Sequence, residues 1–254
     1  MAGQRERALA YIAEYVTTTT GPRDLTTAIA LAMRAYIDLP ADLLPAVPTS
    51  YSTLVQLLTV RDIKTNLAWA HYFWAATSYL QNDLYSAEEH FGAVVELVDN
   101  AHAATYTHSA IGLALTYQAQ GRCQEAAAVI ESAQKRLAAR QQHHVLEWAE
   151  AFAAELAARQ GRVEEALRWV SRKGRQHEYD ATPLFYVPGL AAVRVLLAGG
   201  SAGNLLAARY WLEQQIDLAR RTHNAHAQIQ CYALEAALYE TQGERAKAHE
   251  ALAS

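Results

Sequence analysis

Four short, turn-like tetrads recur along the chain, each ahead of an alanine-containing helical run, and this repeat constrains the fold more than any other feature. The tetrads begin at Gln81, Gln120, Gln160 and Gln242, and a looser glycine-rich segment spans residues 199–204. Each tetrad has Asn or Gly at its second position, and these residues adopt the left-handed conformation past a helix end at low steric cost. We therefore expect each tetrad to end one helix and to precede the next.

An alanine follows each turn, early in the second helix. These alanines are spaced by about 40 residues, which is typical of stacked helical repeats, and they are Ala87, Ala126, Ala166, Ala208 and Ala248. Because alanine has a small side chain, it lets two helix backbones approach closely. The sequence therefore predicts an all-α solenoid of stacked helix pairs.

Composition and charge disfavour several classes of protein. Hydrophobic residues make up 52% of the 254 residues, so the chain is not disordered. The net charge of -4, without a long basic run, disfavours binding of nucleic acid by this chain. No apolar stretch reaches the ~18 residues that suggest a membrane span. Cys123 and Cys231 lie far apart and read as small packing residues, so a reducing, cytoplasmic setting fits best.

The expected helices form one solenoid over residues 1–254, in three parts. Residues 1–40 hold a degenerate first pair, and residues 41–63 hold a loop and an inserted helix that is capped by Thr49 or Ser50 and packs over the inner surface or covers an edge. This inserted helix carries Leu54, Leu57, Leu58 and Val60.

Residues 64–254 hold five regular pairs. Their first helices are expected at 66–81, 103–119, 142–159, 184–198 and 225–241, and their second helices at 84–99, 123–140, 163–174, 204–222 and 244–253. Residues 172–180 read as a polar connector between two pairs. Terminal repeats normally carry a polar cap, and the array stops soon after Ala248, so we expect a piece of a longer protein.

The units resemble tetratricopeptide repeats. The best match to that pattern comprises Leu113, Ala114, Tyr117, Gly121, Ala126 and Ala133. A period near 40 residues, against the usual period of about 34, means longer helices. That longer form resembles the superhelical sensor region of MalT-like, LuxR-type signal-transduction ATPases that regulate transcription. The resemblance covers about residues 64–254, with its best stretches at 161–169, 190–200 and 214–224.

The resemblance implies a right-handed superhelical α-solenoid that binds an inducer. In such regulators a nucleotide-binding domain precedes the repeats and a helix-turn-helix follows them. The chain contains neither a Gly-x-x-x-x-Gly-Lys-Ser/Thr phosphate loop nor a terminal helix-turn-helix, so ATP and DNA activities would belong to flanking parts. We expect no cofactor. The expected partner is a small-molecule effector or a peptide or protein. Any self-association is expected of the full-length protein.

Outward positions on the first helices, which line the concave side of such arrays, are the candidate binding residues. They are Trp69, Tyr72, Tyr79, His108, Gln118, Trp148, Glu155, Arg194, Gln230 and Glu240. Aromatic rings with polar tips suit sugars, small effectors or peptides. The alternative for each aromatic residue is packing in the core, where most large aromatic side chains lie.

Arg194 stands out because its helix is otherwise apolar, and a buried arginine needs a partner. The expected partner is a carboxylate such as Glu155 or Glu240, and a ligand is the alternative.

A catalytic role finds little support in the sequence. His143 and His144 lie near Glu147 and Glu150, but metal sites need convergent ligands, and a solvated helix start is the commoner arrangement. No serine or cysteine has a paired base at a recognisable spacing. The expected function is effector sensing without catalysis or a bound metal, and the alternative is a general tetratricopeptide-type scaffold that binds a peptide or a helix.

Overall fold

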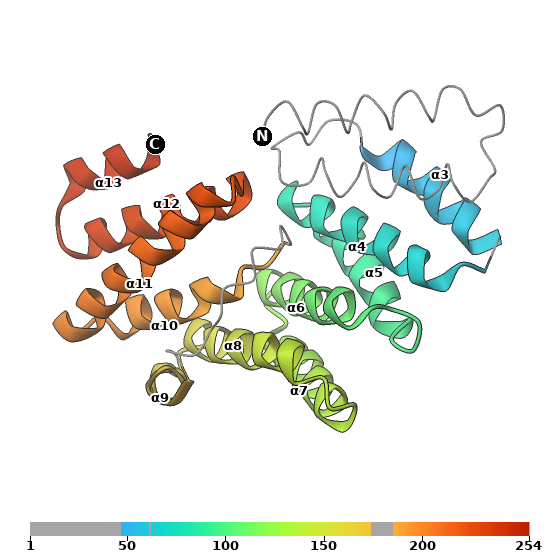
Figure 1. Ribbon diagram of the computed structural model, residues 1–254, viewed down its shortest axis with the longest axis horizontal. Coiled ribbons are helices and arrows are strands. Elements are labelled where there is room, and N and C mark those ends of the chain that lie inside the picture. Colours follow the sequence, from blue (N-terminus) through green and yellow to red (C-terminus); the bar gives the residue numbers. More distant parts are fainter. Residues whose placement is uncertain (1–46, 61, 174–184, 254) are drawn as a thin grey trace. The chain divides into compact units, whose positions relative to one another are not determined.

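The computed structural model describes residues 47–60, 62–173 and 185–253 (Figure 1). Within these ranges all regular structure is helical, which confirms the predicted all-α class. The helix pair expected in residues 1–40 lies outside the described residues, and so does most of the expected connector, over residues 174–184. The superhelical geometry and its period stay predictions.

Contacts within the chain divide it into two compact units, of which unit 1 comprises residues 1–145. Its described helices are α3 (Val47–Val60), α4 (Lys64–Leu80), α5 (Leu84–Glu96), α6 (Ala103–Ala119) and α7 (Cys123–Ala139). Each helix packs against the next one along the chain, and α4 also contacts α6.

The predicted inserted helix is present as α3, which packs against α4 with Leu54 and Leu58 buried. The expected cap at Thr49 or Ser50 is wrong, because α3 already begins at Val47. Proline is tolerated in the first turn of a helix, where its missing N–H is not needed, so Pro48 does not delay the start.

Unit 2 comprises residues 146–254. Its elements are most of α8 (His143–Arg159), then α9 (Val163–Lys173), the 3₁₀ turn η2 (Pro188–Leu190), α10 (Ala191–Gly199), α11 (Ala202–Arg221), α12 (Ala225–Thr241) and α13 (Arg245–Leu252). From α9 onward each α-helix packs against the next one, and α10 also contacts α12. The first helices of successive pairs in this unit are therefore α8, α10 and α12.

Most predicted helix bounds agree with the structure to within two or three residues. The bounds of α6 and α12 are as predicted, whereas α5 ends at Glu96 and not at residue 99. Helix α11 begins at Ala202, earlier than predicted, because the Ser201 hydroxyl oxygen accepts a hydrogen bond from the Asn204 amide at 3.2 Å and caps the helix.

The predicted left-handed turns are confirmed. Asn82, Gly121, Gly161 and Gly243 have φ angles of 62°, 79°, 81° and 76°. In the turn at Gly121, the Arg122 amide donates to the Tyr117 carbonyl oxygen at 2.8 Å, and the equivalent bond closes the other three turns. This bond satisfies one of the last carbonyl groups of the helix, so the left-handed residue and the helix end depend on each other.

The alanines that follow these turns, Ala87, Ala126, Ala166, Ala208 and Ala248, are all buried, as their spacing predicted. A second close approach involves Gly112 on α6. A Cβ atom at this position would lie only 2.3 Å from the Phe91 ring of α5, so any residue larger than glycine requires the ring to shift.

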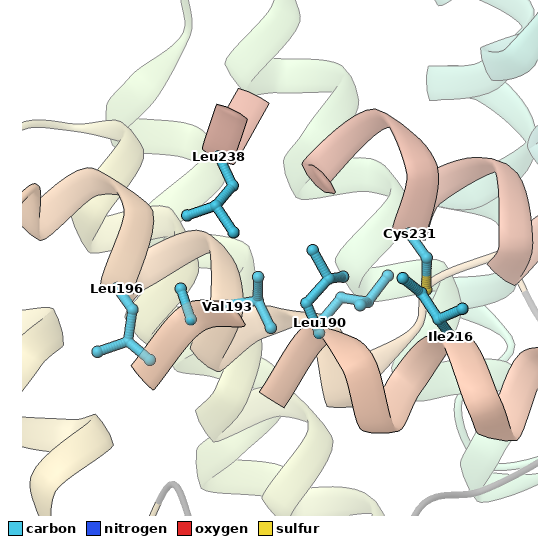
Figure 2. Close-up of a cluster of buried hydrophobic side chains, with 8 residues drawn as sticks. Leu190, Val193, Leu196, Ile216, Cys231 and Leu238 are labelled. Carbon is cyan, nitrogen blue, oxygen red and sulfur yellow. The ribbon is translucent and has the colours of Figure 1, made fainter. Parts of the chain in front are cut away.

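A hydrophobic cluster holds α10, α11 and α12 together in unit 2 (Figure 2). It contains Leu190, Val193, Leu196, Ala208, Leu212, Ile216, Cys231 and Leu238. Cys231 is buried, as expected of a small packing residue, and burial raises the pKa of its thiol to about 12. The same expectation is wrong for Cys123, which is exposed because it is the first residue of α7, ahead of the packed stripe.

The helix predicted over residues 184–198 is shorter than expected, because α10 starts only at Ala191. Pro188 disfavours helical backbone in the residue before it, and Val187 is extended with φ -106° and ψ 97°. At Gly189 a Cβ atom would come within 2.6 Å of the Gln215 side-chain oxygen, so the chain passes very close to α11. The non-helical segment ahead of η2 supplies two residues to the site described next.

Candidate functional site

The site begins with a buried carboxylate in unit 2. Glu155 lies in the middle of α8, is 1% exposed, and has apolar neighbours on both sides, Ala154 and Leu156. Because a carboxylate loses its hydration on burial, it must be paired and hydrogen-bonded to be tolerated.

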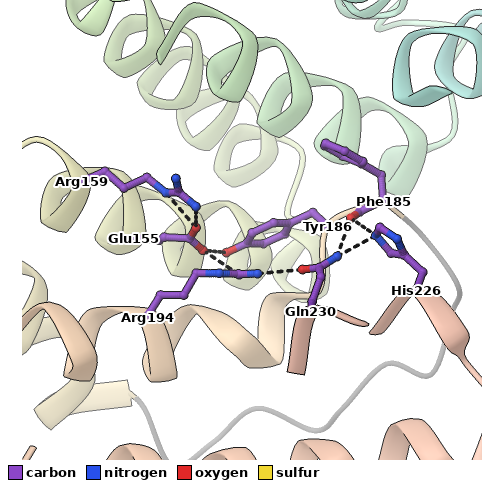
Figure 3. A network of polar contacts seen from close by, with 7 residues as sticks. All are labelled: Glu155, Arg159, Phe185, Tyr186, Arg194, His226 and Gln230. Carbon is purple, nitrogen blue, oxygen red and sulfur yellow. Dashed lines mark hydrogen bonds and ion pairs between the residues drawn. The ribbon is translucent and has the colours of Figure 1, made fainter. Parts of the chain in front are cut away.

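Three side chains satisfy both oxygens of Glu155 (Figure 3). Arg159, one turn later on α8, donates to Oε1 from Nε at 3.0 Å and from Nη2 at 2.7 Å. Arg194 of α10 donates from Nη1 to Oε2 at 3.1 Å, and the Tyr186 hydroxyl donates to the same oxygen at 3.0 Å. The predicted structural pairing of Arg194 with Glu155 is therefore confirmed.

The other carboxylate suggested for Arg194 lies elsewhere. Glu240, near the end of α12, is exposed, and its oxygen lies 3.9 Å from Nε of Arg245. This is a solvated surface contact, and such ion pairs contribute little to stability.

Burial and charge act in opposite directions on Glu155. Burial alone would raise the pKa of its carboxyl, but the charges of Arg194 and Arg159, with the hydrogen bonds from Arg159 and Tyr186, lower that pKa below its usual value. Burial and the adjacent carboxylate raise the pKa of Tyr186 well above its usual value. Glu155 is therefore ionised and Tyr186 protonated.

From Arg194 the network continues to α12. Nη2 of Arg194 donates to the side-chain oxygen of Gln230 at 2.7 Å. The side-chain nitrogen of Gln230 lies 2.6 Å from Nε2 of His226 and 3.4 Å from the Phe185 carbonyl oxygen. Nε2 of His226 lies 2.9 Å from that same oxygen (Figure 3). The network thus joins α8, the segment before η2, α10 and α12.

The network divides into a dry end and a wetter end. Glu155 and Tyr186 are buried, whereas the Arg194 side chain is 17% exposed and both Gln230 and His226 are half-buried. The less buried end of the network therefore lies on α10 and α12.

The sequence predicted some members of this network and missed others. The pairing of Arg194 with Glu155 was expected, whereas Gln230 was expected only as another residue of the binding surface. Arg159 and Tyr186 were not expected, although the spacing of four residues between Glu155 and Arg159 is a detectable signal for a helical pair. His226 is the other member that was not predicted.

The remaining candidate residues take no part in this network. Tyr72, His108 and Trp148 are buried, so core packing accounts for them. In unit 1 the Tyr72 and His108 ring centroids are 6.3 Å apart, in an edge-on arrangement. The half-buried candidates of unit 1 are Trp69, Tyr79 and Gln118, and Trp69 stacks on Phe73 with ring centroids 5.5 Å apart.

Unit 1 contains a histidine pair that the sequence did not reveal. The Nδ1 atoms of His71 on α4 and His90 on α5 lie 3.2 Å apart, and Trp74 covers His90 with ring centroids 3.9 Å apart. Burial, and then the charge of His90, lowers the pKa of His71 to about 4, and burial lowers the pKa of His90 to about 4. Both rings are therefore neutral at pH 7, and one donates a hydrogen bond to the other.

Two features, a metal-binding cluster and a membrane-spanning helix, are absent from the described residues. No three histidine, cysteine, aspartate or glutamate side chains in that part of the chain converge on a point where a metal ion would fit. Among the helices described, none has both the length and the apolar character needed to cross a membrane.

Comparison with known proteins identifies the repeat family. No curated protein and no solved structure matches the chain. The family described as the MalT-like TPR region matches residues 1–254, the full length of the sequence. The helix pairs, their left-handed turns and their buried alanines agree with this match. The chain therefore belongs to the MalT-like tetratricopeptide repeat family.

Proposed function

We propose that this chain is the effector-sensing region of a MalT-like, LuxR-type transcriptional regulator. It binds a small molecule or a protein partner on the surface formed by the first helices of its pairs, in the cytoplasm. The family match supports the regulator as the setting. The binding role rests on the polar network of unit 2.

The observation that carries the proposal is that one network spans the first helices of three successive pairs. Glu155 lies on α8, Arg194 on α10 and Gln230 on α12. A buried ion pair is weak evidence for a purely stabilising role, because apolar residues of similar volume often stabilise as well or better. A network with a half-exposed end instead gives a ligand a place to act on three helix pairs at once.

A ligand that changes this network changes the contacts between α8, α10 and α12. Ligands act on an equilibrium only through different affinities for its states, and a polar network offers discrete alternatives. The rest of a regulator would then respond to the altered arrangement of these helices.

The alternative is a scaffold that binds a peptide or a partner helix, and one observation favours it. Ile229 of α12 is 53% exposed and lies next to Gln230. An exposed apolar side chain beside polar ones suits a peptide surface as well as a small ligand.

A thermal-shift screen of sugars, amino acids, small carboxylates and peptides tests the proposal, because a ligand of the folded state raises Tm. The proposal predicts at least one ligand whose shift disappears in Arg194→Ala but remains in Arg221→Ala, a control at an exposed position near the end of α11. Loss of secondary structure in Arg194→Ala would be checked by circular dichroism. Ligands that shift Tm equally in both variants would contradict the proposal, and peptides alone would favour the scaffold.

A further inference from the structure

The hydrogen bonds of Arg194 fix the orientation of the Gln230 amide. Nη2 of Arg194 carries only donors, so it requires the Gln230 oxygen, which lies 2.7 Å away. The Gln230 nitrogen, also a donor only, must then face Nε2 of His226 and the Phe185 carbonyl oxygen. Turning the amide over would place two donors against each other at Arg194.

This orientation creates a conflict among three atoms. Without a proton on Nε2, His226 accepts a hydrogen bond from the Gln230 nitrogen at 2.6 Å. The Nε2 lone pair then also faces the Phe185 carbonyl oxygen at 2.9 Å, and these two acceptors repel each other. With a proton on Nε2, His226 donates a hydrogen bond to the Phe185 carbonyl oxygen, but its N–H then faces the N–H group of Gln230, which is also a donor. No protonation state satisfies all three contacts, so Gln230 is the weakest-held member of the network.

Of the two hydrogen bonds described for the Arg194 guanidinium, the one to Gln230 is the weaker. Nη1 holds the ionised Glu155, whereas Nη2 holds a neutral amide. The guanidinium charge assists both bonds, but only the bond to Glu155 joins two opposite charges. A carboxylate at Nη2 would be attracted to the full charge of Arg194, which favours an anion in place of that amide.

We propose that the effector bears a carboxylate that displaces the Gln230 side-chain oxygen from Nη2 of Arg194. Glu155 keeps Nη1, and His226, relieved of the Gln230 nitrogen, donates from Nε2 to the Phe185 carbonyl oxygen. This inference rests on the proposed function and names the class of ligand: a small carboxylic acid in its ionised form.

Two substitutions of Gln230 test the exchange in opposite directions. Gln230→Ala removes the competitor, so small carboxylates bind with a Kd lower by about tenfold, the equivalent of one net hydrogen bond. Gln230→Glu supplies a carboxylate from the chain itself, occupies Arg194 and abolishes binding. Ala237→Glu adds a negative charge at an exposed position about two turns away on α12 and leaves binding as in the wild type.

The probes are acetate, succinate and benzoate, each compared with its uncharged amide at constant ionic strength by thermal shift and isothermal titration. We expect the carboxylates, and not the amides, to stabilise the wild type and, more strongly, Gln230→Ala. Equal effects of acids and amides, no response in Gln230→Ala, or an undiminished response in Gln230→Glu would overturn the inference.

The two proposals fail separately. Neutral sugars or peptides that bind through Arg194, while carboxylates do not, would overturn the inference and leave the proposed function intact. If no ligand in either experiment depends on Arg194, the proposed function fails together with the inference.

Discussion

Arg194 brings a full positive charge into the interior of unit 2, and the structure shows how that charge is tolerated. Glu155 neutralises it from α8, and Gln230 accepts a further hydrogen bond from α12. Glu155 in turn depends on Arg194, because the carboxylate is buried, Arg159 binds Oε1, and the only other donor described at Oε2 is the neutral Tyr186 hydroxyl.

Replacing Arg194 by methionine is expected to destabilise the chain by about 3 kcal/mol, since the buried Glu155 loses one of its two arginine partners and keeps Arg159. Urea denaturation followed by circular dichroism measures the loss. Arg221→Met, at an exposed position near the end of α11, should change stability by less than about 0.5 kcal/mol. A loss below about 1 kcal/mol for Arg194→Met would show that the pair is not structurally important.

The histidine pair of unit 1 predicts a dependence of stability on pH. The pKa of both His71 and His90 is lowered to about 4 in the folded chain, whereas unfolded histidine titrates near 6.5. Between these values the unfolded state binds protons that the folded state does not, so stability falls as the pH drops from about 6.5 to about 4, and this contribution levels off below that.

Melting temperatures from pH 8 to pH 3.5 test this dependence. The double variant His71→Asn/His90→Asn should lose much of the decline in Tm between pH 6.5 and pH 4. A matched variant, His249→Asn at an exposed position, should keep it. If the double variant shows the same decline as the wild type, other groups cause it.

At the scale of elements, small residues allow paired helices to pack closely. Gly112 of α6 faces the Phe91 ring of α5 so closely that a methyl group has no room. Gly92 of α5 has no atom within 4 Å of the position its Cβ would take. These two glycines, both inside helices, differ only in what surrounds them.

Alanine at the two positions should therefore have opposite effects. Gly112→Ala should destabilise by about 1–3 kcal/mol through overpacking. Gly92→Ala should stabilise by up to about 1 kcal/mol, because alanine favours the helix. Chemical denaturation of both variants measures the difference, and similar effects of the two substitutions would mean that the contact with Phe91 relaxes at little cost.

Helix bounds were predictable where local chemistry sets them. The left-handed residues at Asn82, Gly121 and Gly161 mark the ends of α4, α6 and α8 in the sequence itself. The error at residues 184–198 arose where Pro188, a residue with its own backbone preference, was read as part of a continuous helix.

The site was less predictable than the helices. A lone arginine on an apolar helix indicated a buried charge and its carboxylate, because an unpaired charge is costly anywhere in a core. Tyr186 and the Phe185 carbonyl group enter the site only because the chain is not yet helical before Pro188, and His226 only because α12 lies beside that segment. Such contacts depend on packing between residues about 40 positions apart, which no local pattern encodes.

At the scale of the whole molecule, the family match and the described helices agree on a chain built from tetratricopeptide-like pairs. Within unit 2 the hydrophobic cluster joins α10, α11 and α12, and the polar network adds α8 to them. Under the proposed function, α8, α10 and α12 therefore form one cooperative element through which ligand binding would be transmitted.

Native-state hydrogen exchange of the wild type and Arg194→Met tests that central claim most directly, since exchange reports which segments open together. We predict that the backbone amides of α8, α10 and α12 lose protection together in the variant, while those of α4 to α6 in unit 1 are unchanged. Loss of protection confined to α10 would contradict the account, because the network would then not couple the three helices.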